Sequence, residues 1–266
     1  MLGIAAGIVA VLVGAAVLVD PAPAPPPAPV VDLDDPVKLD IAMQLVASAE
    51  NSTLDWRAQY GYLEDIADGR GYTGGIIGFT SGTGDMLEVV RAYTAAVPGN
   101  GLAPYLPALE AVDGTDSHDG LGDGFVAAWH AAADDPAFRA AQDHVRDTDY
   151  LGPAVAQGQA DGLGTLGQFV YFDALVMHGP GEDADSFGGI REAALAAADP
   201  PSRGGDETAY LDAFLDARVA VMRREAAHSD TTRVDTEQRV FLREGNLGLD
   251  PPLEWQTYGD SYRIGA

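Results

Sequence analysis

The sequence predicts an α+β protein that is mostly helical, and three observations carry this prediction. The chain has 266 residues, 47% of them apolar, which is enough material for one large domain or two smaller lobes around a packed core. From Thr83 onward, apolar residues recur with the spacing of amphipathic helices, interrupted by Gly, Pro and Asp. Residues 56–80 instead combine alternating aromatics with glycine turns, which predicts a small sheet.

The N-terminal segment is apolar and is followed by a proline-rich stretch. Residues 2–19 carry no charge, and their length fits either the core of a signal peptide or a helix that crosses a bilayer. No Lys or Arg precedes this run, so both alternatives stay open for residues 1–19. Residues 20–31 contain PAPAPPPAP, which favours an extended linker because proline cannot continue a helix. We expect residues 32–266 to form the folded domain, secreted or tethered to the outer face of the membrane.

The first helix is expected over residues 37–50. Its apolar positions recur at helical spacing: Leu39, Ala42, Met43, Val46 and Ala49. Beyond it the period changes, because aromatic residues occupy even positions between 56 and 62 and predict a strand within 56–66. The polar turn 68–71 and the β-rich run 72–80 would complete an antiparallel hairpin or small sheet.

The rest of the chain is expected to be helical. The predicted helices cover residues 84–97, 102–112, 124–133, 136–148, 163–178, 187–198, 206–228 and 230–243. Bulky aromatic side chains usually lie in the interior, so we expect a core role for the three tryptophans, Trp56, Trp129 and Trp255.

Charge and composition exclude several classes of protein. Asp and Glu total 41 against 15 Lys and Arg, so the net charge is −26, and nucleic acid is not an expected partner. A field of this sign attracts cations, which points to a cationic substrate, a metal or a high-salt environment. The chain has no cysteine, so disulfides, thiol nucleophiles and iron–sulfur clusters are excluded. There is no phosphate-binding loop, HExxH, GxSxG or dinucleotide fingerprint either.

Metal binding is not expected. The five histidines lack ligand spacing and are expected to be structural residues: His118, His130, His144, His178 and His228. The Asp-rich segment 113–123 does not match a calcium-binding loop and is expected to be a solvated acidic loop. No cofactor is predicted.

Two carboxylates stand in contrasting environments. Glu50 closes an apolar helix, where the negative end of the helix dipole favours the protonated carboxyl, and Asp68 follows eighteen residues later in a polar glycine turn. Such a contrast suits glycoside hydrolysis, which needs one carboxyl as acid and a second that stays ionised. Aromatics interleaved with Asp and Arg are also typical of a carbohydrate groove. In a chain with 41 acidic residues, the spacing alone leaves a chance pair open.

A much longer resemblance accompanies this pair. It runs through IAMQLVASAENSTLDWRAQYGYLEDIADGRGYTGGIIGF, GTGDM, PGNGLAPYLPAL, GTDSHDGL, ADGLGTLGQFVYFDALVMHGPG, SFGGIREAAL, GGDETAYLDAFLDARV and TTRVDTEQRVFL. From Leu39 to Tyr258 the chain resembles the glycoside hydrolase family 46 chitosanases. The resemblance implies a lysozyme-like fold of two mainly helical lobes with a small sheet beside the substrate cleft. It also implies a catalytic domain that hydrolyses the β-1,4 bonds of chitosan at internal sites, with inversion at the anomeric carbon.

The resemblance also assigns roles to residues. It implies that Glu50 is the general acid, that Asp68 is the general base, and that Thr73 helps to hold the attacking water. It implies that Asp85 binds a substrate ammonium group. The other implied groove residues are Tyr62, Arg70, Glu225 and His228.

A second implied set is a charged cluster formed by Asp173, Arg218 and Arg233. The resemblance places it beneath the catalytic carboxylates as a support. A buried Arg–Asp–Arg network can equally serve only to hold the lobes together, so that alternative stays open.

Two other functions remain as alternatives. One is a lysozyme-like enzyme that cleaves peptidoglycan, although the anionic cell wall would be repelled by an acidic groove. The other is a secreted, non-catalytic chitosan-binding protein, which would be expected to lack one of the two carboxylates. We expect a monomeric, cofactor-free chitosanase.

Overall fold

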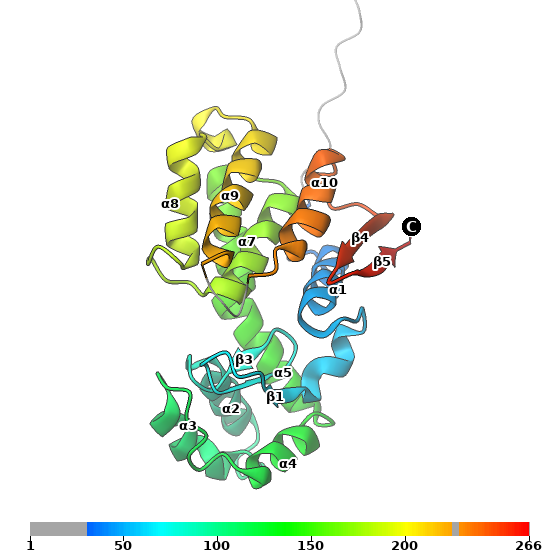
Figure 1. Ribbon diagram of the computed structural model, residues 1–266. Helices are drawn as coiled ribbons and strands as arrows, with labels where there is room; N and C mark the ends of the chain where they lie inside the picture. Colours follow the sequence, from blue (N-terminus) through cyan, green and yellow to red (C-terminus); the bar gives the residue numbers. More distant parts are fainter. Residues whose placement is uncertain (1–30, 225–228, 266) are drawn as a thin grey trace, which may run out of the picture.

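The computed structural model describes residues 31–224 and 229–265. The predicted signal or anchor, residues 1–19, and nearly all of the predicted linker lie outside these residues. In the described ranges, no helix combines the length and hydrophobicity needed to span a bilayer. Figure 1 shows two lobes, one containing α2–α5 with β1–β3 and the other containing α1, α7–α10, β4 and β5. The predicted α+β, mostly helical fold with a small sheet is confirmed.

Helix α1 (Pro36–Asn51) matches the expected helix 37–50 and places Glu50 in its last turn. The Asp35 side chain caps its start by accepting from the backbone N–H groups of Val37 and Lys38, and Pro36 occupies the first turn, where its missing N–H costs nothing. The helix ends at Ser52, which adopts the left-handed conformation and donates its N–H to the Ala47 carbonyl.

The segment after α1 differs from the prediction at its beginning. Residues Trp56–Gly61 form a 3₁₀-helix, η1, and the strand β1 is confined to Leu63–Asp65. Asp55 caps η1 by accepting from the Ala58 N–H, so a side chain supplies the local bond that competes with strand pairing. The aromatic alternation reflects the burial of Trp56 and Tyr60 on one face of this short helix.

The predicted small sheet is present. Strands β2 (Tyr72–Gly74) and β3 (Phe79–Thr80) complete an antiparallel sheet in the order β1-β2-β3. The connection between β1 and β2 carries Asp68, and Thr73 pairs with Glu64 across the two strands.

Helices of the first lobe and the connecting region follow in order. Their bounds are α2 (Asp85–Ala96), η2 (Ala103–Tyr105), α3 (Leu106–Val112), α4 (Asp123–Ala132), α5 (Pro136–Val145), the π-helical turn η3 (Arg146–Leu151) and α6 (Gly152–Asp161). Helix α6 was not predicted. Its Gly152-Pro153 start resembles a break in the sequence, but proline fits the first turn of a helix. Between α3 and α4, the aspartates of segment 113–123 are exposed, as predicted.

The second lobe contains the remaining elements. They are α7 (Thr165–His178), α8 (Phe187–Ala197), η4 (Pro201–Arg203), α9 (Glu207–Met222), the π-helical turn η6 (Arg233–Gln238), α10 (Arg239–Arg243), β4 (Leu253–Thr257) and β5 (Asp260–Ile264). The predicted helix 230–243 is present as one continuous helical stretch, which is π-helical over η6 and α-helical over α10. The hairpin β4–β5 was not predicted. In β4, Leu253, Trp255 and Thr257 are buried and alternate with exposed residues, and the alternation of residue types in LEWQT is a sequence signal for such a strand.

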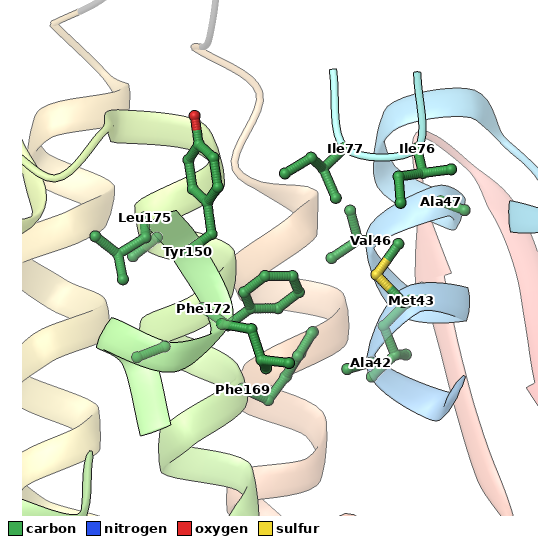
Figure 2. Packing of buried hydrophobic residues seen from close by; sticks show 14 of the residues in the cluster. Ala42, Met43, Val46, Ala47, Ile76, Ile77, Tyr150, Phe169, Phe172 and Leu175 are labelled. Carbon is green, nitrogen blue, oxygen red and sulfur yellow. The ribbon is translucent and has the colours of Figure 1, made fainter. Parts of the chain in front are cut away.

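The core is centred on α7, in which every residue from Thr165 to Leu175 is buried. A helix that is apolar on all sides must be surrounded by other elements. Figure 2 shows α1 facing it, with Met43 and Val46 directed toward Phe169 and Phe172, and Ile76 and Ile77 of the sheet region lying above α1. The core role predicted for the three tryptophans is confirmed: Trp56 is 7%, Trp129 0% and Trp255 4% exposed.

A buried amide fixes the sheet to the first lobe. Gln142 of α5 is fully buried, and its side chain donates to the Tyr60 carbonyl and accepts from the Ile76 N–H. These bonds satisfy one backbone group on each side of the sheet, both of which would otherwise be costly to bury. Asp68 and Thr73 are thereby carried by the first lobe.

Candidate active site

Glu50 is bonded to a chain of buried charges from the second lobe. Arg233 of η6 donates to Glu50 Oε1 at 2.5 Å, and its other guanidinium nitrogens contact both oxygens of Asp173. Arg218 of α9 donates to Asp173 Oδ2 at 2.6 Å. Burial by itself would raise the pKa of Asp173, but the two guanidinium groups lower it to about 2. The structure thus brings Asp173, Arg218 and Arg233 together directly behind Glu50.

Asp68 is fixed by its own turn. Its carboxylate accepts from the Arg70 backbone N–H at 3.0 Å and from the Arg70 side chain at 2.7 Å and 2.6 Å. The side chain of Asp68 is only 3% exposed, whereas that of Glu50 is 28% exposed. The order of burial is the reverse of the one expected from an apolar helix end and a polar turn, because Asp68 is the more buried carboxyl; each of the two carboxyls is paired with a different arginine.

Both carboxylates line one cavity of about 410 Å³. Thr73 lies in its wall with its side chain nearly buried, and Thr73 Oγ1 has no hydrogen-bond partner within residues 31–224 and 229–265. Gly78 lies close to both Thr73 and Glu50. A Cβ atom added to Gly78 would be 3.4 Å from Thr73 Cγ2 and 3.7 Å from Glu50 Oε2. Its φ of +77° also favours glycine. The cavity thus holds two carboxylates and an unpaired hydroxyl around open space.

A larger cavity of about 1060 Å³ continues from this one. The two share several lining residues from both lobes: Asp68, Arg70, Gly78, Val176 and Met177. They are therefore two parts of one groove between the lobes. We call the part with Glu50 the catalytic cavity and the part with Asp85 the outer groove.

Asp85 lines the outer groove from the start of α2. It is the first residue of α2, and its Oδ1 accepts from Thr80 N, Thr83 Oγ1 and Met86 N. Its Oδ2 accepts from the Tyr150 hydroxyl at 2.7 Å. Burial raises the pKa of Asp85, and these hydrogen bonds oppose the rise. Tyr150 also lines the outer groove and was not singled out from the sequence.

The other predicted groove residues have different outcomes. Arg70 lines both parts of the groove. Tyr62 donates to Glu64 at 3.4 Å; burial raises its pKa, and the charges of Glu64 and Glu50 raise it further. Glu225 and His228 lie outside the described residues.

Among the described residues, His118 packs edge-on against Tyr72, and two more of the histidines predicted to be structural lie within hydrogen-bond distance of a partner. His130 Nδ1 is 2.7 Å from the Gly61 carbonyl, and His178 lines the outer groove while its Nε2 lies 3.3 Å from Arg218 Nε. The described residues contain no group of three or more His, Asp or Glu side chains that could hold a metal ion.

Glu237 is a buried acid that sequence reasoning missed. Its side chain is fully buried, one oxygen accepts from Thr257 Oγ1 at 3.3 Å and lies 3.5 Å from Ser48 Oγ, and the other oxygen has no partner among the described residues. Burial and the charge of Asp173 raise its pKa well above the ordinary value, against the opposing effect of Arg233 and Arg218. Its position one helical turn after Arg233 was the available signal.

Two carboxylates that line one cavity from different lobes are compatible with the paired carboxyls of a glycoside hydrolase. Comparison with known proteins identifies which one. The model of glycosyl hydrolase family 46 matches residues 44–253, and the chain belongs to this family of glycoside hydrolases.

Named relatives support this assignment. The chain is 65% identical over 234 residues to a chitosanase of a Streptomyces species, covering 88% of this chain and 84% of the relative. It is 41% identical over 231 residues to a chitosanase of Bacillus subtilis, covering 82% of each.

Solved structures agree with the fold. A co-crystal structure of a chitosanase with substrate has a TM-score of 0.88 and 66% identity, and the match covers 89% of this chain and all of that one. A family 46 chitosanase of Gynuella sunshinyii in complex with chitotetraose has a TM-score of 0.80 and 36% identity, covering 86% of this chain and 97% of that one.

The buried Glu237 should make the protein less stable as pH rises. Because the folded state keeps the proton above pH 4.5 while the unfolded chain releases it, the free energy of unfolding falls between the unfolded pKa and the higher folded pKa. Glu237→Gln removes this fall, so the variant should gain on the parent by about 1.4 kcal/mol for each pH unit between those two pKa values. Urea denaturation at pH 4.5 and pH 8 measures the difference.

The matched control is Glu254→Gln, at an exposed glutamate of β4. It should leave the pH dependence of stability as in the parent. The prediction would be contradicted if the free energies of unfolding of the parent and Glu237→Gln differed by the same amount at both pH values.

Proposed function

We propose that the protein is an endo-acting chitosanase that cleaves the β-1,4 bonds of glucosamine polymers. The observation that carries this proposal is that Glu50 and Asp68, which come from different lobes, line one cavity within a longer groove. Curated relatives at 65% and 41% identity are chitosanases, and one solved neighbour holds chitotetraose. A groove that continues beyond the catalytic cavity suits a polymer bound on both sides of the cleaved bond.

The proposed mechanism inverts the anomeric configuration. Glu50 Oε2, on the Gly78 side of the cavity, delivers a proton to the glycosidic oxygen. Asp68, held in position by its ion pair with Arg70, takes a proton from a water that attacks the opposite face of the sugar. The unpaired Thr73 hydroxyl is a hydrogen-bonding partner for that water.

The buried charge cluster has a supporting role in this proposal. Arg233 holds Glu50 Oε1 in a fixed position, which leaves Oε2 directed into the cavity. Since Asp173 also binds Arg233, the guanidinium charge is shared, and Glu50 does not face an uncompensated cation. Arg218 completes the cluster by neutralising Asp173.

The charge of the protein fits a polycationic substrate. A net charge of −26 draws protonated glucosamine toward the groove and repels anionic cell wall, which disfavours a peptidoglycan substrate. Within the outer groove, Asp85 is the proposed partner of a substrate ammonium group. Tyr62, Arg70, Glu225 and His228 are proposed to complete the sugar contacts. We also propose that the enzyme acts as a monomer, and that residues 1–19 direct its secretion or tether it to the membrane.

Replacing Glu50 tests the acid role. Glu50→Gln keeps the shape and the bond to Arg233 but cannot donate the proton, so kcat on chitosan should fall by roughly 10² to 10⁴, with little change in thermal stability. Reducing-end release and viscosity loss, measured with the parent and the variant, check this. Activity within a few-fold of the parent would remove Glu50 from the mechanism, and an inactive parent would reject the proposed function.

The stereochemistry tests the role of Asp68. An inverting reaction needs room for a water between base and sugar, with the two carboxyls separated by about 6.5 to 9.5 Å. Proton NMR during early hydrolysis of a glucosamine hexamer should show the α-anomer as the first product. A β-anomer would instead indicate a covalent, retaining mechanism.

Asp85→Asn tests ammonium recognition. Loss of the charge should weaken binding of fully deacetylated chitosan by about 1–3 kcal/mol, because a charge-assisted bond is replaced by a neutral one. Partly acetylated chitosan should suffer less, since fewer of its sugars carry a free amine. Stability should fall by only about 1 kcal/mol, because the asparagine oxygen can still accept the bonds made to Oδ1. Equal losses in kcat/KM on both substrates would contradict the assignment.

A further inference from the structure

The turn between β4 and β5 contains an unusual residue. Thr257 pairs with Asp260, so the turn consists of Tyr258 and Gly259, and both have positive φ, 53° and 89°. A two-residue hairpin of this kind favours Asn-Gly or Asp-Gly, because asparagine and aspartate tolerate the left-handed conformation. A bulky aromatic residue is disfavoured there. The hairpin itself gives no reason for tyrosine at position 258.

The catalytic cavity supplies that reason. Tyr258 lines it together with Glu50, Asp68 and Arg233. The phenol is also electrostatically coupled to this site: burial raises the pKa of Tyr258, Arg233 lowers it, and the charge of Glu50 raises it again. Tyr258 as a whole residue is nonetheless 51% exposed, so it is accessible to a bound molecule.

A second exposed apolar side chain lines the same cavity. Only four large hydrophobic side chains are exposed among the described residues, and two of them, Ile66 and Tyr258, line the catalytic cavity. Ile66 comes from the β1–β2 connection of the first lobe, whereas Tyr258 comes from the β4–β5 turn of the second (Figure 1). Exposed apolar surface that gathers at a polar cavity marks a binding surface. A pyranose ring, with C–H groups on its faces and hydroxyls at its edge, matches an aromatic wall beside carboxylates.

We propose that Tyr258 is a further substrate-binding residue, whose ring stacks on the glucosamine unit next to the bond that Glu50 protonates. The inference rests on the proposed function and adds a contact from the C-terminal hairpin. It explains why the turn keeps a strained aromatic residue in place of the asparagine that it favours, since strained residues persist where they serve a site.

The test replaces Tyr258 with the residue that the turn prefers. Tyr258→Asn should hold or raise the melting temperature, by about 2 °C for a chain of this size, because the strain is relieved. The same change should lower kcat/KM on chitosan by about tenfold, because the stacking surface is lost. Tyr258→Phe keeps the ring and should stay within about threefold of the parent. A variant that is more stable and less active cannot be explained by misfolding.

Binding is measured separately from turnover. In the Glu50→Gln background, calorimetry with a glucosamine hexamer should give about tenfold weaker binding when Tyr258→Asn is added. Asp260→Asn, next to the turn but outside the cavity, is the matched control and should change neither binding nor activity.

Unchanged binding and kcat/KM in Tyr258→Asn would overturn the inference. A loss in Tyr258→Phe as large as that in Tyr258→Asn would also overturn it, because the hydroxyl and not the ring would then be responsible. Failure of the proposed function is distinguishable, since in that case the parent itself would not hydrolyse chitosan.

Discussion

Asp173 accepts hydrogen bonds from Arg218 and Arg233 at a point where the three side chains have almost no contact with solvent. Removing charges from water is costly, so each member of this cluster depends on the others for compensation. The three come from α7, α9 and η6, and Arg233 extends the cluster to Glu50 at the end of α1. The same charge cluster therefore joins three elements of the second lobe and fixes the position of Glu50.

Glu237 adds a constraint to this arrangement. It lies among Ser48 of α1, Thr257 of β4 and the charges of the cluster, where burial and the charge of Asp173 raise the pKa of its carboxyl and favour the neutral form. An ionised group at this position would add an unpaired negative charge beside Asp173. The neutral acid thus lets three segments that border the catalytic cavity pack closely without upsetting its charge balance.

Much of this architecture is predictable from the sequence. Helical spacing indicates α1, and the carboxylate at its end and the glycine turn with Asp68 are visible as a local pattern. The pairing of Arg233 with Glu50 spans 183 positions, and no periodicity reveals it; only the family resemblance places those residues together. Elements with weak or misleading local signals were missed for physical reasons: η1 replaces a strand because Asp55 caps it, and α6 begins with a Gly-Pro pair that resembles a break.

Glu50 and Asp68, the proposed acid and base, are carried by different lobes, and the chain passes from one lobe to the other through the π-helical turn η3 and through the segment after α1. Neither lobe alone determines the distance between the two carboxyls. That distance depends on how the two connections orient the lobes, and irregular helical turns such as η3 can absorb small changes of backbone angle. In the proposed mechanism, substitutions in η3 would therefore alter the reaction without touching the sugar, and a polymer bound across both lobes would hold the two carboxyls at a constant separation during cleavage.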